Sequence, residues 1–496
     1  MEGNDLGCFL NGSWTPGEGV LNVSHDPARG HALVWSGTGA SSAQVDAAVM
    51  SAHGAFEGWA DRTPEERAQY FDGLQDLLDK HADRLADAMI SEMGKPLREA
   101  RAEAGSLAAK VRVSAIAREA LPDFALPNAP GESRWRPLGP MGVIGPYNYP
   151  VHLLHTHVAP ALLAGNTVVV KPSEVTPLTG QIYGEIMAEL GLPDGVFNLV
   201  QGGGEVGAAL AGHPGCAGLA FTGSWATGRR ILEANLDHPH KLVALEMGGR
   251  NVAVVLDDAD LHQAVHELVV GCCLTTGQRC TATSRVVVQA GIAPRLMAAL
   301  VRALGQVRPG DPREDDTLMG PLASEAAQTR YIEALDRLAT TSAVPLLAPS
   351  TPPGGAWVTP SLHQCTSPDA GWRAYIEHEF FGPDLALEVV ADAEEALERV
   401  RWSPYGLSMS VFTANEAIFE WFVARAPAGI FNWNRSTNNA SGLLPFGGVG
   451  RSGNFRPAGS TGALYCAHSI AVLRKAHGVF DADPRFGPIV HAAIEE

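Results

Sequence analysis

The chain has 496 residues, of which 46% are hydrophobic and 18% are charged, and its formal net charge at pH 7 is −18. This length predicts two or more domains with cores of their own, and the composition is typical of a soluble globular protein. The acidic balance argues against a nucleic-acid-binding surface, which needs clustered Lys and Arg. We expect no transmembrane helix, because no run approaches about 20 uninterrupted apolar residues.

The cysteines and the first residues indicate the compartment. The seven cysteines are odd in number and lack the paired spacing of metal ligands, so we expect no metal site. Their pattern is typical of a reducing, cytoplasmic compartment. The chain begins with Gly, Asn, Asp and Pro rather than with a basic segment and an apolar core, so we expect no signal peptide.

The N-terminal part of the chain has helical periodicity. Ser41 or Ser42 is placed to cap a helix that runs through Phe56. The segment Thr63-Pro64-Glu65-Glu66 has the arrangement of a capping box, which predicts one long helix from there to Met93.

Short β-branched runs alternate with helical patterns in the rest of the chain. A first set covers 142–144, 167–170, 196–200 and 218–221, and a second covers 251–255, 284–288, 385–390 and 408–412. Such alternation is typical of βαβ units that form a parallel sheet. Two α/β domains are therefore expected, joined near Gly249.

Two glycine patterns follow predicted strands and compete for the role of a phosphate-binding turn. Gly202-x-Gly204-x-x-Gly207 has the spacing of a dinucleotide-binding fingerprint, although a single match of this kind is weak. The segment from Gly223 to Gly228 also opens a helix, whose amides and positive dipole end favour phosphate. Spacing alone leaves both patterns open.

A thiol and a carboxyl group are the candidates for chemistry. Cys280 follows Arg279, which together with backbone amides is expected to favour the thiolate, the reactive form. Glu246 precedes two glycines that would let a turn swing its carboxylate into a cleft, where burial would raise its pKa towards that of a general base. The alternative for any single cysteine is a small, buried hydrophobic side chain.

Six segments in order along the chain carry a resemblance to a known family. They are Gly145-Pro146-Tyr147-Asn148-Tyr149-Pro150, Lys171-Pro172-Ser173-Glu174, Phe221-Thr222-Gly223-Ser224, Leu245-Glu246-Met247-Gly248-Gly249, Gly277-Gln278-Arg279-Cys280-Thr281 and Glu379-Phe380-Phe381-Gly382-Pro383. In these segments the chain closely resembles the aldehyde dehydrogenase superfamily, and the match runs from about Phe9 to about Leu473.

The resemblance implies an α/β fold with two Rossmann-like domains and a small β oligomerisation arm. It assigns residues 1–121 and 138–249 to an NAD-binding domain, 250–449 to a catalytic domain, and 122–137 with 462–474 to the arm. Such an arm implies a homodimer or a homotetramer.

The resemblance also implies where NAD binds. The turn from Gly223 to Gly228 would hold the cofactor, with Ser224 near the pyrophosphate, and the pattern that begins at Gly202 would be a tight structural turn.

Further cofactor positions follow from the same resemblance. Lys171 and Glu174 match positions at the adenosine ribose, and Ser173 between them is assigned to the same site. A carboxylate there would repel a 2′-phosphate, which favours NAD over NADP. The alternative is that Glu174 caps the next helix. Glu379 matches the residue at the nicotinamide ribose, and Phe381 the aromatic beside the nicotinamide, although Phe381 alone would be assigned to the core.

The catalytic roles implied by the resemblance are those of a covalent mechanism. The Cys280 thiolate would attack an aldehyde, and the Asn148 side-chain amide with the Cys280 backbone N–H would stabilise the oxyanion. Glu246 would activate water to hydrolyse the resulting thioester. The alternative for Asn148 is a polar residue of a proline-bounded turn.

A finer resemblance concerns the substrate. The chain is most similar to the branch that oxidises N-succinylglutamate semialdehyde, through Leu245–Gly249, Asn198–Gly203, Asn432–Asn434, Pro445–Gly448 and Ser452–Pro457. Its carboxylates call for Arg or amide donors, for which Arg279, Asn454 and Arg456 are the candidates.

Three alternatives stay open beside that substrate. Arg250 stands where this branch typically has Asn, and its charge could alter the pKa of Glu246, so another carboxylated semialdehyde, such as succinate semialdehyde, remains in view. A relative that passes the acyl group to coenzyme A is disfavoured because Glu246 is present. A catalytically silent binding protein on the same fold is disfavoured because the motif residues are intact.

Overall fold

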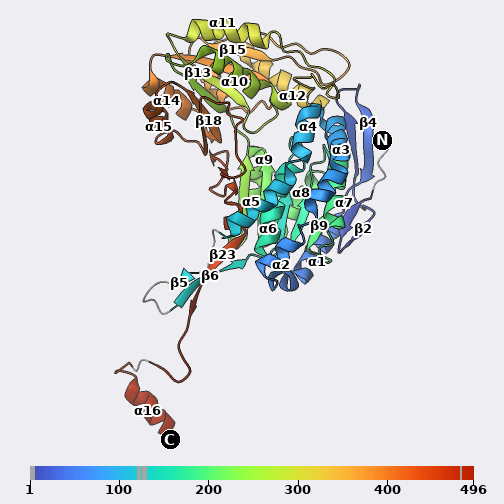
Figure 1. Ribbon diagram of the computed structural model, residues 1–496, viewed down its shortest axis with the longest axis vertical. Helices are drawn as coiled ribbons and strands as arrows, with labels where there is room; N and C mark the ends of the chain where they lie inside the picture. The colour runs from blue at the N-terminus through green and yellow to red at the C-terminus, as the bar shows by residue number, and fades with distance from the viewer. Residues whose placement is uncertain (1–5, 120–123, 126–130, 481–482, 496) are drawn as a thin grey trace.

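The computed structural model describes residues 6–119, 124–125, 131–480 and 483–495. It has two α/β lobes and a slender β arm, beyond which the C-terminal segment extends (Figure 1). Residues 1–5 and 120–121 of the expected NAD-binding domain, and 122–123 and 126–130 of the expected arm, lie outside the described residues. No helix of the described part is long and apolar enough to cross a membrane.

The first lobe is built on a seven-stranded sheet in the order β11-β10-β7-β8-β9-β1-β2. Its parallel strands are β7 (Met141–Ile144), β8 (Val168–Lys171), β9 (Phe197–Leu199), β10 (Gly218–Gly223) and β11 (Leu242–Met247), and the antiparallel edge is β1 (Cys8–Leu10) and β2 (Ser13–Thr15). Val168 and Val170 pack into one core and Val169 into another, so both faces of the sheet are covered. This explains why these strands are mainly apolar.

Helices cover both faces of this sheet. One core contains α3 (Leu74–Met93), α6 (His152–Ala164) and α7 (Pro177–Glu189), and the other contains α1 (Ser42–Ala60), α8 (Gly204–Gly212) and α9 (Trp225–Ala234). Three further helices, α2 (Pro64–Gln69), α4 (Leu97–Ala104) and α5 (Leu107–Glu119), and the hairpin of β3 (Leu21–Asp26) and β4 (Ala32–Thr38) complete this lobe.

The second lobe repeats the plan on another seven-stranded sheet. Its order is β14 (Ala343–Leu347), β15 (Ser361–Cys365), β16 (Asp384–Val390), β13 (Thr283–Gln289), β12 (Asn251–Val255), β18 (Ser408–Phe412) and β19 (Ile430–Trp433), parallel except for β14. Its helices are α10 (Leu261–Cys273), α11 (Ala293–Leu304), α12 (Glu325–Asp336), α13 (Ala370–Ile376), α14 (Ala393–Arg401) and α15 (Glu416–Val423). The expected fold class, two Rossmann-like α/β units, is confirmed.

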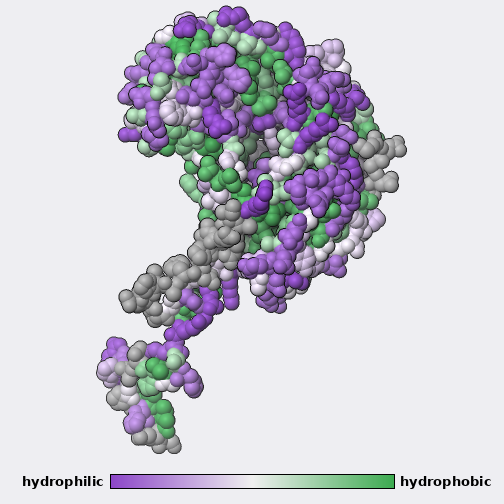
Figure 2. Space-filling model, in the orientation of Figure 1, coloured by the Kyte–Doolittle hydropathy of each residue, from purple (hydrophilic) through white to green (hydrophobic). Residues whose placement is uncertain are grey.

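The arm is a three-stranded antiparallel sheet. Its strands are β5 (Phe124–Ala125), β6 (Gly131–Pro137) and β23 (Ala467–Leu473), and β6 pairs with β23 along its whole length. Beyond the arm, helix α16 (Gly487–Glu495) carries exposed apolar side chains, seen as green atoms near the lower end of Figure 2. The involvement of the arm in assembly stays a prediction.

The N-terminal helices differ from the expectation at one point. Ser41 caps α1 through a capping box with Gln44, and Thr63 caps α2 in the same way. The single long helix expected from Thr63 to Met93 is wrong, because the chain turns after Gln69 and restarts at Leu74. The turn lets Tyr70 pack edge-on against Trp59 at 5.3 Å, a tertiary contact that helical periodicity does not reveal.

Candidate active site

One cavity of about 710 Å³ receives side chains from both lobes. It lies where strands β8, β10 and β11 end, the usual ligand position in an open parallel sheet. Ten of the residues expected from the sequence line it: Asn148, Lys171, Ser173, Glu174, Gly223, Ser224, Glu246, Cys280, Glu379 and Phe381. The fold therefore brings together segments that lie far apart in the chain.

The loop that carries the thiol has an unusual backbone. Thr275 and Thr276 have φ values of 52° and 57°, in the left-handed region that β-branched residues rarely adopt, and Gly277 follows with a φ of 70°. A Cβ atom at Gly277 would lie 2.4 Å from the Gly382 backbone, so only glycine fits there. A tight, strained turn thus delivers Cys280 to the cavity.

The environment of Cys280 favours the thiol in this structure. Burial raises the pKa of Cys280 to about 12, with further increases from the Glu246 and Glu379 carboxylates. Arg279 lowers the pKa, as expected, but its effect is outweighed. The N–H of Thr281 lowers the pKa of Cys280 as well, so both groups favour the thiolate in the expected direction, but burial and the two carboxylates have the larger effect. The guanidinium of Arg279 is also paired with Glu99 at 2.6 Å. Attack by Cys280 therefore requires that its proton be taken up.

Asn148 lies in the turn just before α6 and is buried. Its Nδ2 donates to the carbonyl oxygen of Gln278 at 2.9 Å, which ties this turn to the loop of Cys280. A side-chain amide has two N–H donors, so one of them accounts for this bond and a second is left to donate. Asn148 therefore offers a donor that does not titrate at the cavity that Cys280 also lines.

Glu246 lies on strand β11 and points into a buried setting. Burial raises its pKa well above the usual value, and one carboxylate oxygen, Oε2, has no hydrogen-bond partner among the described residues. A Cβ atom at Gly447 would lie 2.7 Å from the Glu246 Oε1, so the opposite loop leaves room for the carboxylate. A buried carboxyl group with an unpaired oxygen can accept a proton from water.

The glycines after Glu246 have a different purpose from the one expected. They do not swing the Glu246 side chain, which a regular strand already directs into the cavity. A Cβ atom at Gly248 would lie 1.8 Å from Oε1 of Glu379, and the Gly249 N–H donates to that same oxygen at 3.0 Å. The two glycines therefore let the Glu379 carboxylate approach the backbone.

Glu379 and Phe381 form the part of the cavity supplied by the second lobe. Burial raises the pKa of Glu379 to about 7, while the Gly249 N–H and Arg250 lower it. Phe381 has a φ of 53° and meets the ring of Tyr147 edge-on at 5.9 Å. An aromatic residue held in the left-handed region at a cavity wall is a constraint typical of functional sites rather than of a core.

The first lobe supplies a wall of helix N-termini. Ser224 caps α9 by accepting from the Thr227 N–H at 3.3 Å, and α8 begins at Gly204, so both glycine patterns border the same cavity. Gly202 has a φ of 142°, as a tight turn requires, but Gly204 also lines the cavity. Gly228 is not part of the lining. It packs α9 against β11, since a Cβ atom there would lie 2.4 Å from Sδ of Met247.

Lys171 and Glu174 form an ion pair at the same wall. Lys171 Nζ donates to Glu174 Oε2 at 2.8 Å, and this interaction lowers the pKa of Glu174 against the effect of burial. The alternative that Glu174 caps the next helix is wrong: the first amides of α7, at Leu178 and Thr179, donate to Glu92 instead. Glu174 thus keeps acceptor capacity at the cavity.

The first-lobe wall of the cavity has the features that a dinucleotide needs. Two helix N-termini present amides to a phosphate, and the Cβ position at Gly204 has nothing within 4 Å, so a ligand could approach the backbone closely. A carboxylate beside a lysine, as in Glu174 and Lys171, matches the hydroxyl groups of a ribose. The residues present fit the group.

Arg250 acts on a different carboxylate from the one expected. Its guanidinium stacks between Tyr375 and Phe380, 4.9 Å from each ring centroid, and lies 4.0 Å from Asp384. It lowers the pKa of Glu379 but is not among the influences on Glu246. The expected effect of Arg250 on Glu246 is therefore wrong.

The three candidates for substrate carboxylates are engaged elsewhere. Arg279 binds Glu99 and Thr275, and the side chain of Asn454 holds the backbone of strand β11 at Val243 and Leu245. Arg456 is exposed and donates to neighbouring carbonyl groups of its own loop. None of the three lines the cavity, so their role stays a prediction.

Several residues at the site were not predicted. Arg330 of α12, Tyr147 and His378 line the cavity, and Gln278 holds the Ala323 N–H at 3.0 Å. Tyr147 and Gln278 lie inside motifs already noted, so their place in the sequence could have predicted that they line or support the cavity. Arg330 gave none, because its helix is far from the motifs in the chain and only the fold brings it near.

Comparison with known proteins agrees with this geometry. Residues 14–470 match the model of the aldehyde dehydrogenase family. The N-succinylglutamate 5-semialdehyde dehydrogenase of Ectopseudomonas mendocina (strain ymp) is 39% identical over 475 residues, covering 94% of this chain and 96% of that protein.

Solved structures show the same fold. The HpcC protein from Thermus thermophilus superposes with a TM-score of 0.89 at 32% identity, covering 97% of this chain and 95% of the other. A 1-pyrroline-5-carboxylate dehydrogenase from Thermus with bound NAD gives 0.88 at 28% identity, covering 95% and 93%. With a family model that spans most of its length and a cavity that gathers the motif residues, this chain belongs to the aldehyde dehydrogenase family.

Proposed function

We propose that this chain oxidises N-succinyl-L-glutamate 5-semialdehyde to N-succinyl-L-glutamate, a step of arginine catabolism, with NAD as the hydride acceptor. The observation that carries the chemistry is the meeting of Cys280, Asn148 and Glu246 at one cavity. The substrate is inferred from the relatives of that name, which are 38–39% identical to this chain over nearly its full length.

The first step is attack by the thiol. Sγ of Cys280 forms a bond to the aldehyde carbon, and the thiol proton, which burial keeps on the sulfur, passes to water at the cavity. Negative charge then develops on the aldehyde oxygen, where the second N–H of the Asn148 amide and the Cys280 backbone N–H donate to it. Asn148 suits this task because its amide stays neutral over the working pH range.

The second step is removal of the acyl group. A nicotinamide dinucleotide held at this cavity would supply the hydride acceptor, and Cys280 would then carry the acyl group as a thioester. Glu246 takes a proton from water, the hydroxide oxygen bonds to the thioester carbon, and the C–S bond breaks to release the acid. A pKa raised by burial makes Glu246 a stronger base than an exposed carboxylate.

The residues proposed to hold the cofactor are those of the cavity wall. The N-termini of α8 and α9, with Ser224, would receive the pyrophosphate, and Lys171, Ser173 and Glu174 would receive the adenosine ribose. Glu379 and Phe381 would lie at the nicotinamide end. NAD is favoured over NADP because the Glu174 carboxylate would repel a 2′-phosphate.

Two other functions stay as alternatives. Another carboxylated semialdehyde, such as succinate semialdehyde, would use the same chemistry. Transfer of the acyl group to coenzyme A is disfavoured because Glu246, the proposed base for water, lines the cavity and has one carboxylate oxygen without a partner among the described residues. We also propose that the arm, 122–137 with 462–474, joins copies of this chain into a homodimer or homotetramer.

The test is NADH formation by the purified protein with N-succinylglutamate semialdehyde, compared with succinate semialdehyde, glutamate semialdehyde and a neutral aliphatic aldehyde. A clear preference in kcat/KM for the succinylated compound is expected. Activity on another aldehyde alone would keep the chemistry and overturn the substrate. No NADH from any of them would overturn both.

A further inference from the structure

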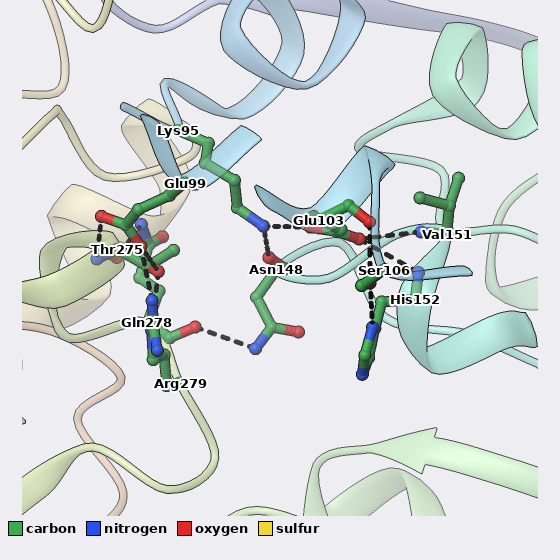
Figure 3. Close-up of polar contacts among 10 residues, drawn as sticks. All are labelled: Lys95, Glu99, Glu103, Ser106, Asn148, Val151, His152, Thr275, Gln278 and Arg279. Atoms are coloured by element: carbon green, nitrogen blue, oxygen red, sulfur yellow. Dashed lines mark hydrogen bonds and ion pairs between the residues drawn. The ribbon is translucent and has the colours of Figure 1, made fainter. Parts of the chain in front are cut away.

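Helix α4 contacts both loops that carry the proposed catalytic groups. Two of its acidic residues, Glu99 and Glu103, are four positions apart and so lie on one face of the helix. Figure 3 shows that Glu103 reaches the turn of Asn148, while Glu99 reaches the loop of Arg279. Neither carboxylate lines the cavity, and nothing in the proposed mechanism uses them.

Glu103 and its partner Lys95 hold the Asn148 turn from two sides. Lys95 Nζ pairs with Glu103 Oε2 and donates to the main-chain oxygen of Asn148 at 2.6 Å, and both side chains are fully buried. Glu103 Oε1 accepts from the N–H groups of Val151 and His152, at 3.2 and 3.1 Å. These amides lie at the start of α6, so the carboxylate also satisfies the positive end of that helix.

Glu99 holds the nucleophile loop in the same manner. Its oxygens accept from the Thr275 N–H at 3.1 Å, from the Thr275 hydroxyl at 2.6 Å and from Arg279 Nη2 at 2.6 Å. Thr275 is one of the residues in the left-handed region, where a threonine is strained. A carboxylate that takes three donors from this loop offsets that strain and fixes the backbone just before Cys280.

The two loops also touch each other. The Asn148 amide donates to Gln278, and the ring of Tyr149 lies beneath Lys95 Nζ at 3.7 Å and Arg279 at 5.3 Å. One short helix thus anchors both loops, one from each lobe, next to the place where they meet.

We infer that Lys95, Glu99 and Glu103 are positioning residues that set the place of the Asn148 amide relative to the Cys280 thiol. The inference rests on the proposed roles of Asn148 and Cys280. An oxyanion donor is effective only when it is held close to its ideal geometry, and a misplacement of about 1 Å can cost on the order of 100-fold in rate. Glu99 and Glu103 on one face of α4, with Lys95 just before the helix, provide such a hold.

The competing explanation is that these groups only stabilise the fold. A buried ion pair affects stability wherever it lies, so a loss of activity in one variant does not distinguish the two explanations. Coupling to Asn148 does distinguish the two explanations. A residue that acts through Asn148 has no further effect once Asn148 is removed, whereas a general loss of stability acts in both backgrounds.

The probe for the test is 4-nitrophenyl acetate. Its carbonyl carbon bonds to Sγ of Cys280, an oxyanion develops at the same place, and 4-nitrophenolate leaves with the bonding electron pair, so neither cofactor nor aldehyde is needed. The rate constant of the nitrophenolate burst is measured for the wild type, Glu99→Gln, Glu103→Gln, Asn148→Ala and the two double variants. The Cys280→Ser variant gives the background from other nucleophiles.

The expected result is non-additive. Each Glu→Gln variant slows the burst by about 10- to 100-fold. In the Asn148→Ala background Glu103→Gln slows it no further, and Glu99→Gln slows it by a smaller factor than in the wild type, because Glu99 also holds the loop of Cys280. Lys95→Arg, which keeps the charge and the donors, retains more of the rate than Lys95→Met. Effects that multiply in the double variants, or an Asn148→Ala variant with a normal burst, would overturn the inference.

A matched control separates position from burial. The Arg285–Glu388 pair is also buried, at 2.8 Å, with side-chain exposures of 0% and 3%, but it lies between β13, β16 and α14. Glu388→Gln should keep a normal burst despite a lower Tm. A burst slowed as much as in Glu99→Gln would assign the effect to stability and overturn the inference.

The two proposals fail in different ways. If no aldehyde yields NADH but the burst shows coupling, the proposed function is overturned and the positioning role stands. If NADH forms normally but the coupling is absent, the proposed function stands and the positioning role is overturned. Should Glu103→Gln not fold, Glu99→Gln carries the test, because its side chain is not fully buried.

Discussion

Polar groups are used in opposite ways at the cavity that Cys280 lines and at helix α4, which holds the loop of Cys280. On the cavity side, Glu246 leaves an oxygen unpaired, and glycines leave backbone exposed for a ligand. At helix α4, the oxygens of Glu99 and Glu103 accept from protein donors and so hold the loops that carry Cys280 and Asn148. Groups left open bind and react, whereas groups that are satisfied hold position.

This contrast predicts that substitutions at the cavity and at helix α4 differ in their effects on activity and stability. Substitutions on the cavity side should change activity or binding with little change in stability. Substitutions on the α4 side should change both, because they leave a buried partner unsatisfied.

Cys280→Ser should have the largest effect on activity. A serine hydroxyl is a far weaker nucleophile than a thiolate, so aldehyde oxidation should fall by on the order of 10⁴-fold or more. Stopped-flow NADH measurements should show neither a burst nor steady turnover, with an unchanged Tm. Turnover near that of the wild type would remove Cys280 from the mechanism.

Lys95→Met should have the largest effect on stability. It leaves the Glu103 carboxylate buried without its cation, at a cost of about 3–5 kcal/mol in the free energy of unfolding. Urea unfolding followed by fluorescence measures this free energy. A loss below about 1 kcal/mol would show that the contacts of α4 with the two loops do not depend on these charges. Lys171→Met, at the cavity, is the comparison variant.

Glu246→Gln should separate the two halves of the reaction. The variant should still form the acyl-enzyme and give one NADH per active site, while the steady rate falls by about 100- to 1,000-fold because water is not activated. Its Tm should be unchanged or higher, because a buried charge with an unpaired oxygen is removed. Rapid-quench detection of the thioester tests this, and an unchanged steady rate would exclude Glu246 as the base.

The pH dependence of hydrolysis follows from the same carboxyl group. Because burial raises the pKa of Glu246 well above 4.5, its basic form appears only at higher pH, and the hydrolytic rate should rise with pH through that raised pKa. The thioester decay rate, measured across pH in single-turnover experiments, should lose this rise in Glu246→Gln. A flat profile in the wild type would contradict the assignment.

Arg456→Ala should have the smallest effect. Its side chain is exposed and bonds only to its own loop, so the change should alter KM for the succinylated aldehyde by no more than about 2-fold and leave Tm unaffected. A much larger rise in KM, absent with a neutral aldehyde, would revive Arg456 as the carboxylate-binding residue.

Local patterns in the sequence predicted the elements and many of the groups at the cavity. The β-branched runs predicted strands of both sheets, and Ser41 and Thr63 predicted helix starts, because capping and β-propensity act over a few residues. The motifs named Cys280, Glu246 and Asn148, but as separate segments. The break in the helix near Tyr70 was not predicted, because it goes with a contact to Trp59, which lies outside that segment.

The sequence by itself determined the α/β class, the thiol, the carboxyl group and the glycine turns, since residue type and spacing along the chain are sufficient for these. Only the tertiary structure decided that Gly248 makes room for Glu379, that Arg279 pairs with Glu99, and that α4 contacts the loops of both Asn148 and Cys280. These facts depend on side chains from different parts of the chain meeting within a few ångströms. Burial and charge at such meetings, and not the residue type alone, set each pKa and each hydrogen bond.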